Sequence, residues 1–154
     1  MNPPLFDKIA ILGLGLIGSS IARAARAQGA VRTIVATSRS PQTRQRVVEL
    51  GIADKVTETN AEAVEGADLV IVCVPVGVCG AVAKEIGPHL KAGATISDVG
   101  SVKGSVVRDM GPHLPKTVHF VPAHPVAGTE HSGPDAGACR RAGAAPWQAA
   151  CARA

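Results

Sequence analysis

Apolar and polar positions follow two different periods along this chain, and the switches between them mark the expected strands and helices. Residues 9–12 form a short continuous apolar run with polar residues before it and glycines after it, which is typical of a buried parallel strand. Between Ile17 and Gly29 the apolar residues recur at steps of three and four, the period of an amphipathic helix. Gly29 is the expected end of that helix.

Later apolar runs predict five further strands, at residues 33–36, 55–58, 68–75, 95–99 and 119–123. Helices are expected between and after them, at residues 41–50, 60–66, 77–90 and 101–110, with Ser40 and Asn60 as N-caps of the first two. Strands that alternate with helices predict an α/β fold, a doubly wound parallel sheet of the Rossmann type. Its expected strand order is 3-2-1-4-5-6, with ligands at the carboxyl ends of the strands.

This pattern divides the chain into a dinucleotide-binding domain, residues 1–137, and an irregular tail, residues 138–154. The tail has eight alanines among its 17 residues and no Leu, Ile, Val or Phe. It therefore offers neither a strand run nor an apolar helix face, and we expect it to be disordered or weakly helical. Its richness in Ala, Arg, Cys and Pro suggests a shifted reading frame or a truncated gene.

Composition excludes several classes of partner. The chain has 154 residues and 46% hydrophobic residues, so one ordinary globular domain is expected, and no apolar run is long enough to span a membrane. Of the net charge of +4, the tail contributes +3 from its arginines, which leaves +1 for residues 1–137 and no basic stripe. The aromatic residues are too few for stacking on nucleic-acid bases. We therefore predict no nucleic-acid and no membrane partner.

The four cysteines, Cys73, Cys79, Cys139 and Cys151, lack the spacing of a zinc site and of a redox pair. We therefore predict no metal site and a reduced, cytoplasmic protein. Cys73 lies within the apolar run of residues 68–75, and we expect it to be an inert core residue.

Three glycines follow the first strand as G-x-G-x-x-G, at Gly13, Gly15 and Gly18. Gly13 permits a tight turn, Gly15 lets a pyrophosphate approach the backbone, and Gly18 lets the helix lie close to the strand. The free N–H groups of the first helical turn would then face the anion. A glycine-rich turn without a ligand is the alternative, but the strand–turn–helix context favours dinucleotide binding.

The end of the second strand predicts which dinucleotide binds. NAD-binding domains usually carry Asp or Glu at this position, whereas this chain has Ser38, Arg39 and Ser40. A guanidinium can pair with a 2′-phosphate that an acid would repel, so NADP is favoured and NAD is possible. Thr37 and Arg44 are weaker candidates for the same phosphate. Alternatively, Arg39 is a solvated loop residue and Ser40 only a helix cap.

Two further segments begin at carboxyl ends of predicted strands, at residues 97–104 and 121–133. The second contains His124 directly before a proline. A histidine at this place can accept a proton from a substrate hydroxyl while the adjacent carbon loses hydride.

From Lys8 to Gly137 the chain resembles the prephenate/arogenate (cyclohexadienyl) dehydrogenases of tyrosine biosynthesis. The segments GLGLIGSS, DVGSVK and HPVAGTEHSG, in this order, carry the resemblance. It implies an NAD(P)-dependent oxidoreductase that oxidatively decarboxylates a small-molecule substrate, prephenate or arogenate.

The resemblance also implies roles for individual residues. His124 matches the catalytic histidine, which hydrogen-bonds the C4 hydroxyl of the cyclohexadienyl ring and promotes its deprotonation. Ser101 matches a serine that orients this hydroxyl and the nicotinamide side. The cofactor-binding matches are Gly13, Gly15, Leu16, Ile17 and Gly18 in the pyrophosphate turn, and Val74, Pro75 and Val76 at the strand end beside the cofactor.

Several residues of these segments keep two interpretations. Ser101 is also a good N-cap, and both roles can hold together. Lys103 could bind a carboxylate or be a solvated lysine of the first helical turn. Asp98 could serve only to tie its loop by hydrogen bonds, and Glu130 and His131 could line the site.

The resemblance ends after Gly137. Relatives continue into a further strand and a helical domain, which forms their dimer and supplies arginine for the substrate carboxylates. Without that domain we expect no family homodimer and weak or absent dehydrogenase activity of this polypeptide alone. The alternative function is that of a dinucleotide-binding remnant without catalysis.

Overall fold

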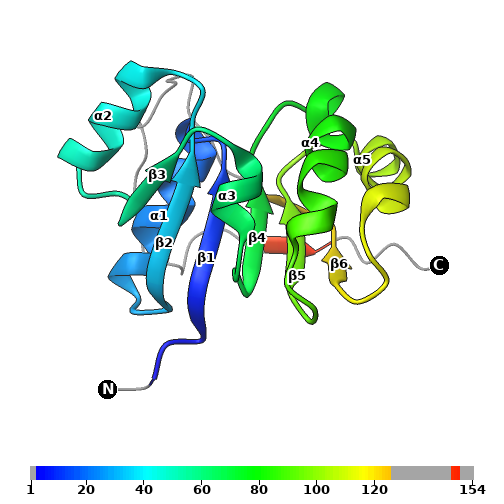
Figure 1. The fold of residues 1–154 in the computed structure, drawn as a ribbon, viewed down its shortest axis with the longest axis horizontal. Helices are drawn as coiled ribbons and strands as arrows, with labels where there is room; N and C mark the ends of the chain where they lie inside the picture. The colour runs from blue at the N-terminus through cyan, green and yellow to red at the C-terminus, as the bar shows by residue number, and fades with distance from the viewer. Residues whose placement is uncertain (1–2, 126–146, 150–154) are drawn as a thin grey trace.

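The computed structural model describes residues 3–125 and 147–149. Six parallel strands form one sheet in the order β3-β2-β1-β4-β5-β6, which confirms the predicted Rossmann-type order (Figure 1). β1 pairs with β2 on one side and with β4 on the other, so the glycine turn that follows β1 leaves the middle of the sheet. The strands are β1 (Phe6–Leu12), β2 (Val31–Thr37), β3 (Lys55–Thr57), β4 (Leu69–Val72), β5 (Thr95–Asp98) and β6 (His119–Val121).

Helices cover both faces of the sheet, as Figure 1 shows. Ala10 and Leu12 of β1 lie in one apolar core together with residues of α3, α4 and α5. Ile9 and Ile11 lie in a second core with residues of α1 and α2. Because successive strand residues point to opposite faces and both faces are buried, β1 is a continuous apolar run. The helices are α1 (Leu16–Ala27), α2 (Pro41–Glu49), α3 (Asn60–Val64), α4 (Cys79–Ile86) and α5 (Lys103–Met110).

The strand predicted at residues 68–75 is shorter in the structure and ends at Val72. The Cys73 N–H still donates to the Leu12 carbonyl at 2.8 Å, and the chain then bends. Pro75 has no N–H with which to continue the ladder. The helix predicted at residues 77–90 is divided into the 3-10 turn η1 (Val76–Val78), α4 and the 3-10 turn η2 (Gly87–His89), and a third such turn, η3 (Gly111–His113), follows α5.

The strand predicted at residues 119–123 is interrupted at Pro122. The parallel ladder between β5 and β6 ends at the pair Ser97–Val121, and β7 (Ala123–Pro125) follows as a separate strand. β7 pairs in antiparallel orientation with β8 (Trp147–Ala149), which lies within the predicted tail. The other tail residues are outside the described ranges, so the expectation for them stays a prediction.

Two of the predicted N-caps are wrong. α2 begins as predicted, because the Thr43 N–H donates to Ser40 Oγ at 3.2 Å. α3, however, is capped by Thr59 rather than by Asn60. α5 starts at Lys103 without a side-chain cap, so Ser101 is not its N-cap.

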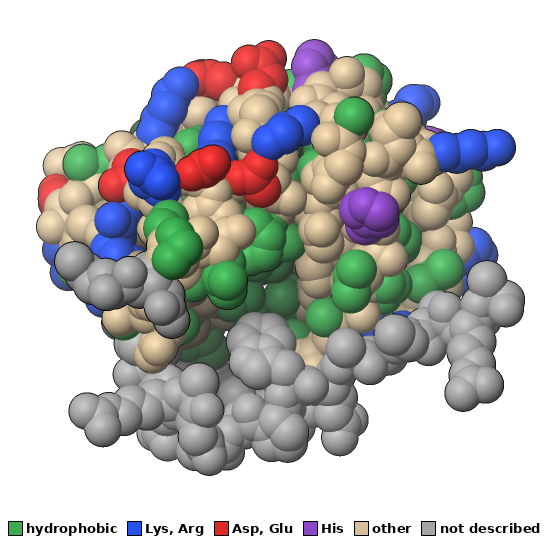
Figure 2. Space-filling view, turned by 90° about the horizontal axis from the view of Figure 1, so that it is seen from below, with side chains coloured by type: hydrophobic (Ala, Val, Ile, Leu, Met, Phe, Trp, Pro, Cys, Tyr) green, Lys and Arg blue, Asp and Glu red, His purple; other side chains and the backbone are tan. Residues whose placement is uncertain are grey.

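Charged side chains of opposite sign lie close together on the surface. Figure 2 shows this on one face, where basic and acidic groups are interleaved. Ion pairs include Arg32–Asp7 at 3.1 Å and Lys55–Glu62 at 2.7 Å. Over the described ranges, none of the helices combines the length and the hydropathy that a membrane crossing requires.

Candidate active site

The glycine turn after β1 is closely packed at two of its three glycines. Gly13 has a φ of +96°, and a Cβ there would lie 2.6 Å from the carbonyl oxygen of Cys73. A Cβ on Gly18 would lie 2.2 Å from the carbonyl oxygen of Gly13. A Cβ on Gly15 would have no heavy atom of the described chain within 4 Å. Gly13 and Gly18 therefore serve the packing of the turn, while Gly15 leaves open space above the backbone.

The N-terminus of α1 faces this space without a cap. Gly15 is the N-cap residue and has no side chain, and the first turn contains no acid. The N–H groups of Leu16, Ile17 and Gly18 have no acceptor among residues 3–125 and 147–149, and the first bonded amide is that of Ser19. Three free amides at a helix N-terminus attract an anion. The turn therefore fits the diphosphate of a dinucleotide.

Ser38, Arg39 and Ser40 lie beside this turn, because Thr37 at the end of β2 pairs with Leu12 at the end of β1. The Arg39 side chain is exposed and makes no hydrogen bond or ion pair to the described residues. Ser38 Oγ accepts the Ser40 N–H at 3.3 Å. A free guanidinium therefore stands at the predicted 2′-phosphate position.

The two weaker phosphate candidates are engaged elsewhere. Arg44 Nη1 donates to the Ser38 carbonyl at 2.9 Å, and Nη2 pairs with Glu58 at 2.7 Å. Thr37 Oγ1 is buried and donates to Asn60 Oδ1 at 2.9 Å. Arg39 is thus the guanidinium of this loop that remains available.

Val74, Pro75 and Val76 follow β4 and connect the glycine turn with the segment after β5. Val74 Cγ1 lies 3.3 Å from the point that a Cβ on Gly13 would occupy. Val76 Cγ2 lies 3.0 Å from the point that a Cβ on Gly100 would occupy. The three residues therefore lie at the carboxyl edge of the sheet, between the two turns that the sequence assigns to cofactor and substrate.

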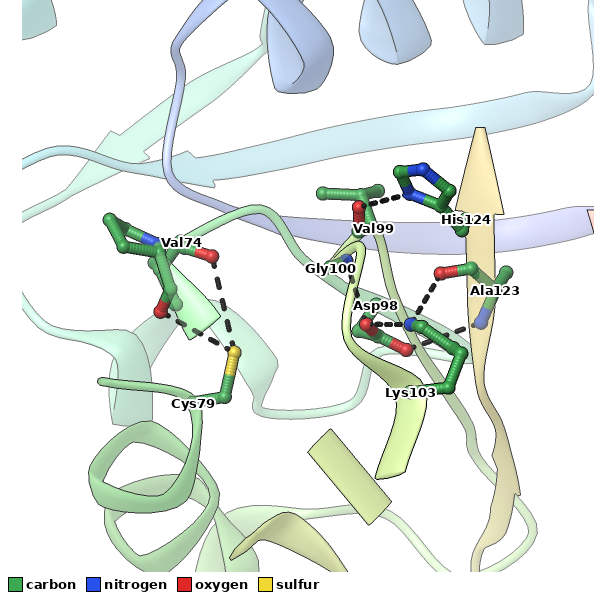
Figure 3. Close-up of polar contacts among 9 residues, drawn as sticks. Val74, Cys79, Asp98, Val99, Gly100, Lys103, Ala123 and His124 are labelled. Carbon is green, nitrogen blue, oxygen red and sulfur yellow. Dashed lines mark hydrogen bonds and ion pairs between the residues drawn. The ribbon is translucent and has the colours of Figure 1, made fainter. Parts of the chain in front are cut away.

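His124 lies in β7 and is half-buried. Its Nδ1 is 3.1 Å from the carbonyl oxygen of Val99, which follows β5 (Figure 3). A carbonyl can only accept, so Nδ1 carries the proton of the neutral ring and Nε2 carries the lone pair. The imidazole is thus held as a proton acceptor at Nε2. The Ser101 side chain is exposed two residues beyond Val99.

Asp98 and Lys103 form a buried ion pair beside His124. The Asp98 side chain is fully buried and that of Lys103 is 18% exposed. Asp98 Oδ2 accepts the Gly100 N–H at 2.8 Å, which confirms that this carboxylate ties its loop. Of the two interpretations of Lys103, that of a solvated lysine is wrong, because its ammonium is bound to Asp98 and to the Ala123 carbonyl. Its binding of a substrate carboxylate stays a prediction.

The two described cysteines are held as thiols. Burial, together with the negative charge of Asp98, raises the pKa of Cys73 to about 12. Burial also raises the pKa of Cys79, whose Sγ lies 3.9 Å from the Val74 carbonyl oxygen (Figure 3) and 3.6 Å from that of Pro75. A protonated thiol is a poor nucleophile and metal ligand, as predicted for Cys73. Among the described residues, no cluster of His, Cys, Asp and Glu could hold a metal ion.

Sequence reasoning did not find the pairing of Lys103 or the role of the Val99 carbonyl. The sequence contained one signal for the pair: Asp98 ends a predicted strand five residues before Lys103, which lies near the start of a predicted helix. A main-chain acceptor leaves no signal in the residue types. Glu130 and His131, the other candidates, lie outside the described residues.

Comparison with known proteins gives one consistent result. Residues 21–146 match the family model described as prephenate dehydrogenase, nucleotide-binding domain. The chain is 47% identical over 133 residues to the cyclohexadienyl dehydrogenase of Zymomonas mobilis subsp. mobilis, a match that covers 86% of this chain and 45% of the relative. It is 33% identical over 128 residues to the prephenate dehydrogenase of Bacillus subtilis, a match that covers 82% of this chain and 34% of that relative.

Solved structures agree with these matches. The prephenate dehydrogenase of Aquifex aeolicus in complex with hydroxyphenyl propionate and NAD+ superposes with a TM-score of 0.77 at 33% identity, covering 86% of this chain and 46% of that one. The arogenate dehydrogenase of Synechocystis gives a TM-score of 0.76 at 29% identity, and this match covers 85% of this chain and 45% of that one. The chain therefore spans less than half the length of each of these four relatives.

Proposed function

Because this chain belongs to the prephenate dehydrogenase family, through the nucleotide-binding domain of that family, we propose that it acts in the NAD(P)-dependent oxidative decarboxylation of prephenate or arogenate. This reaction belongs to tyrosine biosynthesis, and we place it in the cytoplasm. The observation that carries the proposal is the pairing of two features at one edge of the sheet. They are the uncapped N-terminus of α1 and the His124 imidazole, whose Nε2 has no partner among the described residues.

The diphosphate of the cofactor is assigned to the free amides of Leu16, Ile17 and Gly18, over the open position at Gly15. Val74, Pro75 and Val76 are assigned to the wall beside the cofactor, at the end of β4. We assign a 2′-phosphate to Arg39, assisted by Ser38 and Ser40, and therefore propose that NADP is preferred over NAD.

The proton step is assigned to His124. Its Nδ1–H donates to Val99, so Nε2 accepts the proton of the substrate hydroxyl. The bound oxidised nicotinamide supplies the hydride acceptor for the carbon that bears this hydroxyl. Ser101, with its exposed side chain after β5, is assigned to orient the hydroxyl toward the imidazole. Loss of the ring carboxylate as CO₂ leaves an aromatic ring.

The experiment is a two-stage measurement on the purified 154-residue chain. NADPH and NADH are first titrated with the nicotinamide fluorescence as readout, and turnover is then measured with prephenate and with arogenate. We expect binding of both dinucleotides and, in line with the weak activity expected of this polypeptide alone, slow production of them from the oxidised forms. The variant His124→Asn retains a donor toward Val99 but loses Nε2, so kcat should fall by about 10²–10⁴-fold with dinucleotide affinity unchanged.

His119→Asn is the matched control, because His119 is exposed at the start of β6, and this change should leave kcat unaltered. Turnover that survives in His124→Asn would contradict the assigned proton acceptor. Dinucleotide binding without any turnover would instead favour the second candidate function, a dinucleotide-binding module without catalysis. That candidate would keep the diphosphate site assigned to the uncapped N-terminus of α1 and would need no proton acceptor.

A further inference from the structure

The Asp98 carboxylate is the centre of a hydrogen-bond network at the end of β5. The residue is 1% exposed, and its carboxylate accepts from three donors. Oδ2 accepts the Gly100 N–H at 2.8 Å and also the ammonium of Lys103, while Oδ1 accepts the Ala123 N–H at 3.2 Å (Figure 3). A buried carboxylate is costly unless its oxygens are bonded, and here both are.

Lys103 completes the attachment of β7. Its ammonium donates to Asp98 and also to the Ala123 carbonyl oxygen at 2.6 Å. The N–H and the C=O of Ala123 are therefore both bound by the same ion pair. The ladder between β5 and β6 ends at Ser97–Val121, so this ion pair takes the place of strand pairing where Ala123 passes β5.

His124 is the residue after Ala123, and its imidazole bonds the Val99 carbonyl at 3.1 Å. Val99 lies between Asp98 and Gly100, inside the turn that the Asp98 carboxylate closes. One carboxylate therefore restrains both partners of the imidazole bond, the strand that carries the ring and the turn that carries its acceptor.

We infer that Asp98 and Lys103 are positioning residues for His124, which hold its ring in the orientation that protonates Nδ1 and leaves Nε2 free. This inference rests on the proposed function of His124 as the proton acceptor. Neither residue has to touch the substrate, because their effect passes through Ala123 and Val99. A fixed tautomer places the lone pair toward the reacting hydroxyl before the substrate binds.

A structural role alone is the competing explanation, and the chain contains a matched comparison for it. Asp68 also pairs with a lysine, Lys91, and also accepts two main-chain N–H groups, those of Asp7 and Lys8, at 2.9 and 3.0 Å. Asp68 precedes β4, so it lies at the amino edge of the sheet, opposite to the edge that carries His124.

The test uses the full chain labelled with ¹⁵N-histidine, with the His124 signals assigned by their loss in His124→Gln. Long-range ¹H–¹⁵N spectra of the neutral ring separate a protonated nitrogen from one with a lone pair. We expect the unaltered protein to show a protonated Nδ1 and an unprotonated Nε2. In Asp98→Asn the two nitrogen shifts should move together toward the average of a freely exchanging imidazole, whereas Asp68→Asn should leave them unchanged.

Asp98→Asn leaves Lys103 without its counter-charge, so the double variant Asp98→Asn/Lys103→Gln is measured beside it and should show the same averaging. With substrate, kcat should fall by about 100-fold in both while dinucleotide affinity stays the same. Unchanged nitrogen shifts in a folded Asp98 variant would overturn the inference. Loss of the fold in both variants, with Asp68→Asn folded, would overturn it in favour of a structural role.

The nitrogen shifts are read without substrate, which separates this test from that of the proposed function. Absence of turnover in the unaltered chain would count against the dehydrogenase assignment and would leave the shifts of the variants interpretable. If the His124 tautomer changes in Asp98→Asn but not in Asp68→Asn, the positioning role is supported whether or not the unaltered chain turns over substrate.

Discussion

At the scale of single residues, the three glycines of one motif have different physical roles. Gly13 and Gly18 face backbone oxygens that a side chain would strike, at 2.6 and 2.2 Å from the added Cβ. Gly15 faces open space and has an ordinary φ of −85°. The first two glycines are therefore required by the folded chain itself, while the third is required only if a ligand approaches the backbone.

This difference predicts opposite outcomes for two alanine substitutions. Gly18→Ala should lower the free energy of unfolding by about 1–3 kcal/mol or more, because its Cβ overlaps a main-chain oxygen. Gly15→Ala should leave that free energy within about 0.5 kcal/mol, yet weaken NADPH binding by about tenfold or more, since the Cβ would occupy the diphosphate site. Urea unfolding and fluorescence titration measure the two effects. Unimpaired NADPH binding in Gly15→Ala would remove the diphosphate assignment.

At the scale of elements, the junction between β2 and α2 combines a structural and a binding function. Ser40 caps α2, and Arg44 of the same helix binds back to the Ser38 carbonyl, so the loop is fixed from the helix side. Arg39, between the two serines, is exposed. A loop held by these bonds, with a guanidinium that has no partner within residues 3–125 and 147–149, suits recognition of a phosphate group.

Replacing that guanidinium with a carboxylate should reverse the cofactor preference. Arg39→Asp removes a charge-assisted partner of the 2′-phosphate, so the ratio of NADPH to NADH affinity should fall by about 10–100-fold. The control is Arg32→Asp, an exposed arginine at the opposite end of the same strand, which should leave the ratio unchanged. Equal ratios in the two variants would disprove the NADP assignment.

At the scale of the whole molecule, paired charges hold the two edges of the sheet. Asp98 with Lys103 closes the carboxyl edge beside His124, and Asp68 with Lys91 closes the amino edge beside the start of β1. Hydrogen bonds from Lys91, Lys8 and Asp7 lower the pKa of Asp68 below its ordinary value. One pair thus belongs to the candidate site, and the other contributes to stability alone.

The lowered pKa of Asp68 predicts a pH-dependent stability. Its contribution is complete above the ordinary carboxyl pKa of about 3.9 and is lost as the pH falls through the lower folded-state pKa. Asp68→Asn should therefore lower the free energy of unfolding by about 1–3 kcal/mol at pH 7. The difference between the two proteins should begin to shrink below about pH 4 and should vanish only below the folded-state pKa of Asp68. Urea unfolding between pH 7 and pH 3 measures this.

Glu62→Gln is the control variant for these unfolding measurements. The Glu62–Lys55 pair is on the surface, and both side chains are about half exposed. Its removal should cost no more than about 0.5 kcal/mol at any pH. A constant difference between the Asp68 variant and the unaltered protein across the pH range would exclude the assigned role of this carboxylate.

The sequence by itself determined the order of the elements, the parallel sheet and the position of the glycine turn. These features depend on local periodicity and on residues that are neighbours in the chain, such as the run of residues 9–12 and the glycines after it. It also indicated His124 and Arg39 as candidates, from their places after predicted strands. It was wrong about the cap of α3, where Thr59 and Asn60 are adjacent polar residues, and about that of α5, which starts after Val102 without a side-chain cap.

Only the tertiary structure decided which polar groups bond to one another. The pairing of Lys103 with the Ala123 carbonyl, of His124 with Val99 and of Asp98 with the Ala123 N–H joins residues 20 to 25 positions apart. The same holds for Arg44, whose Nη2 pairs with Glu58 from a different element, so that Arg44 is engaged while Arg39 has no side-chain partner among the described residues. Such pairs depend on how strands and helices meet in space, and the pattern of residue types along a chain carries no record of that.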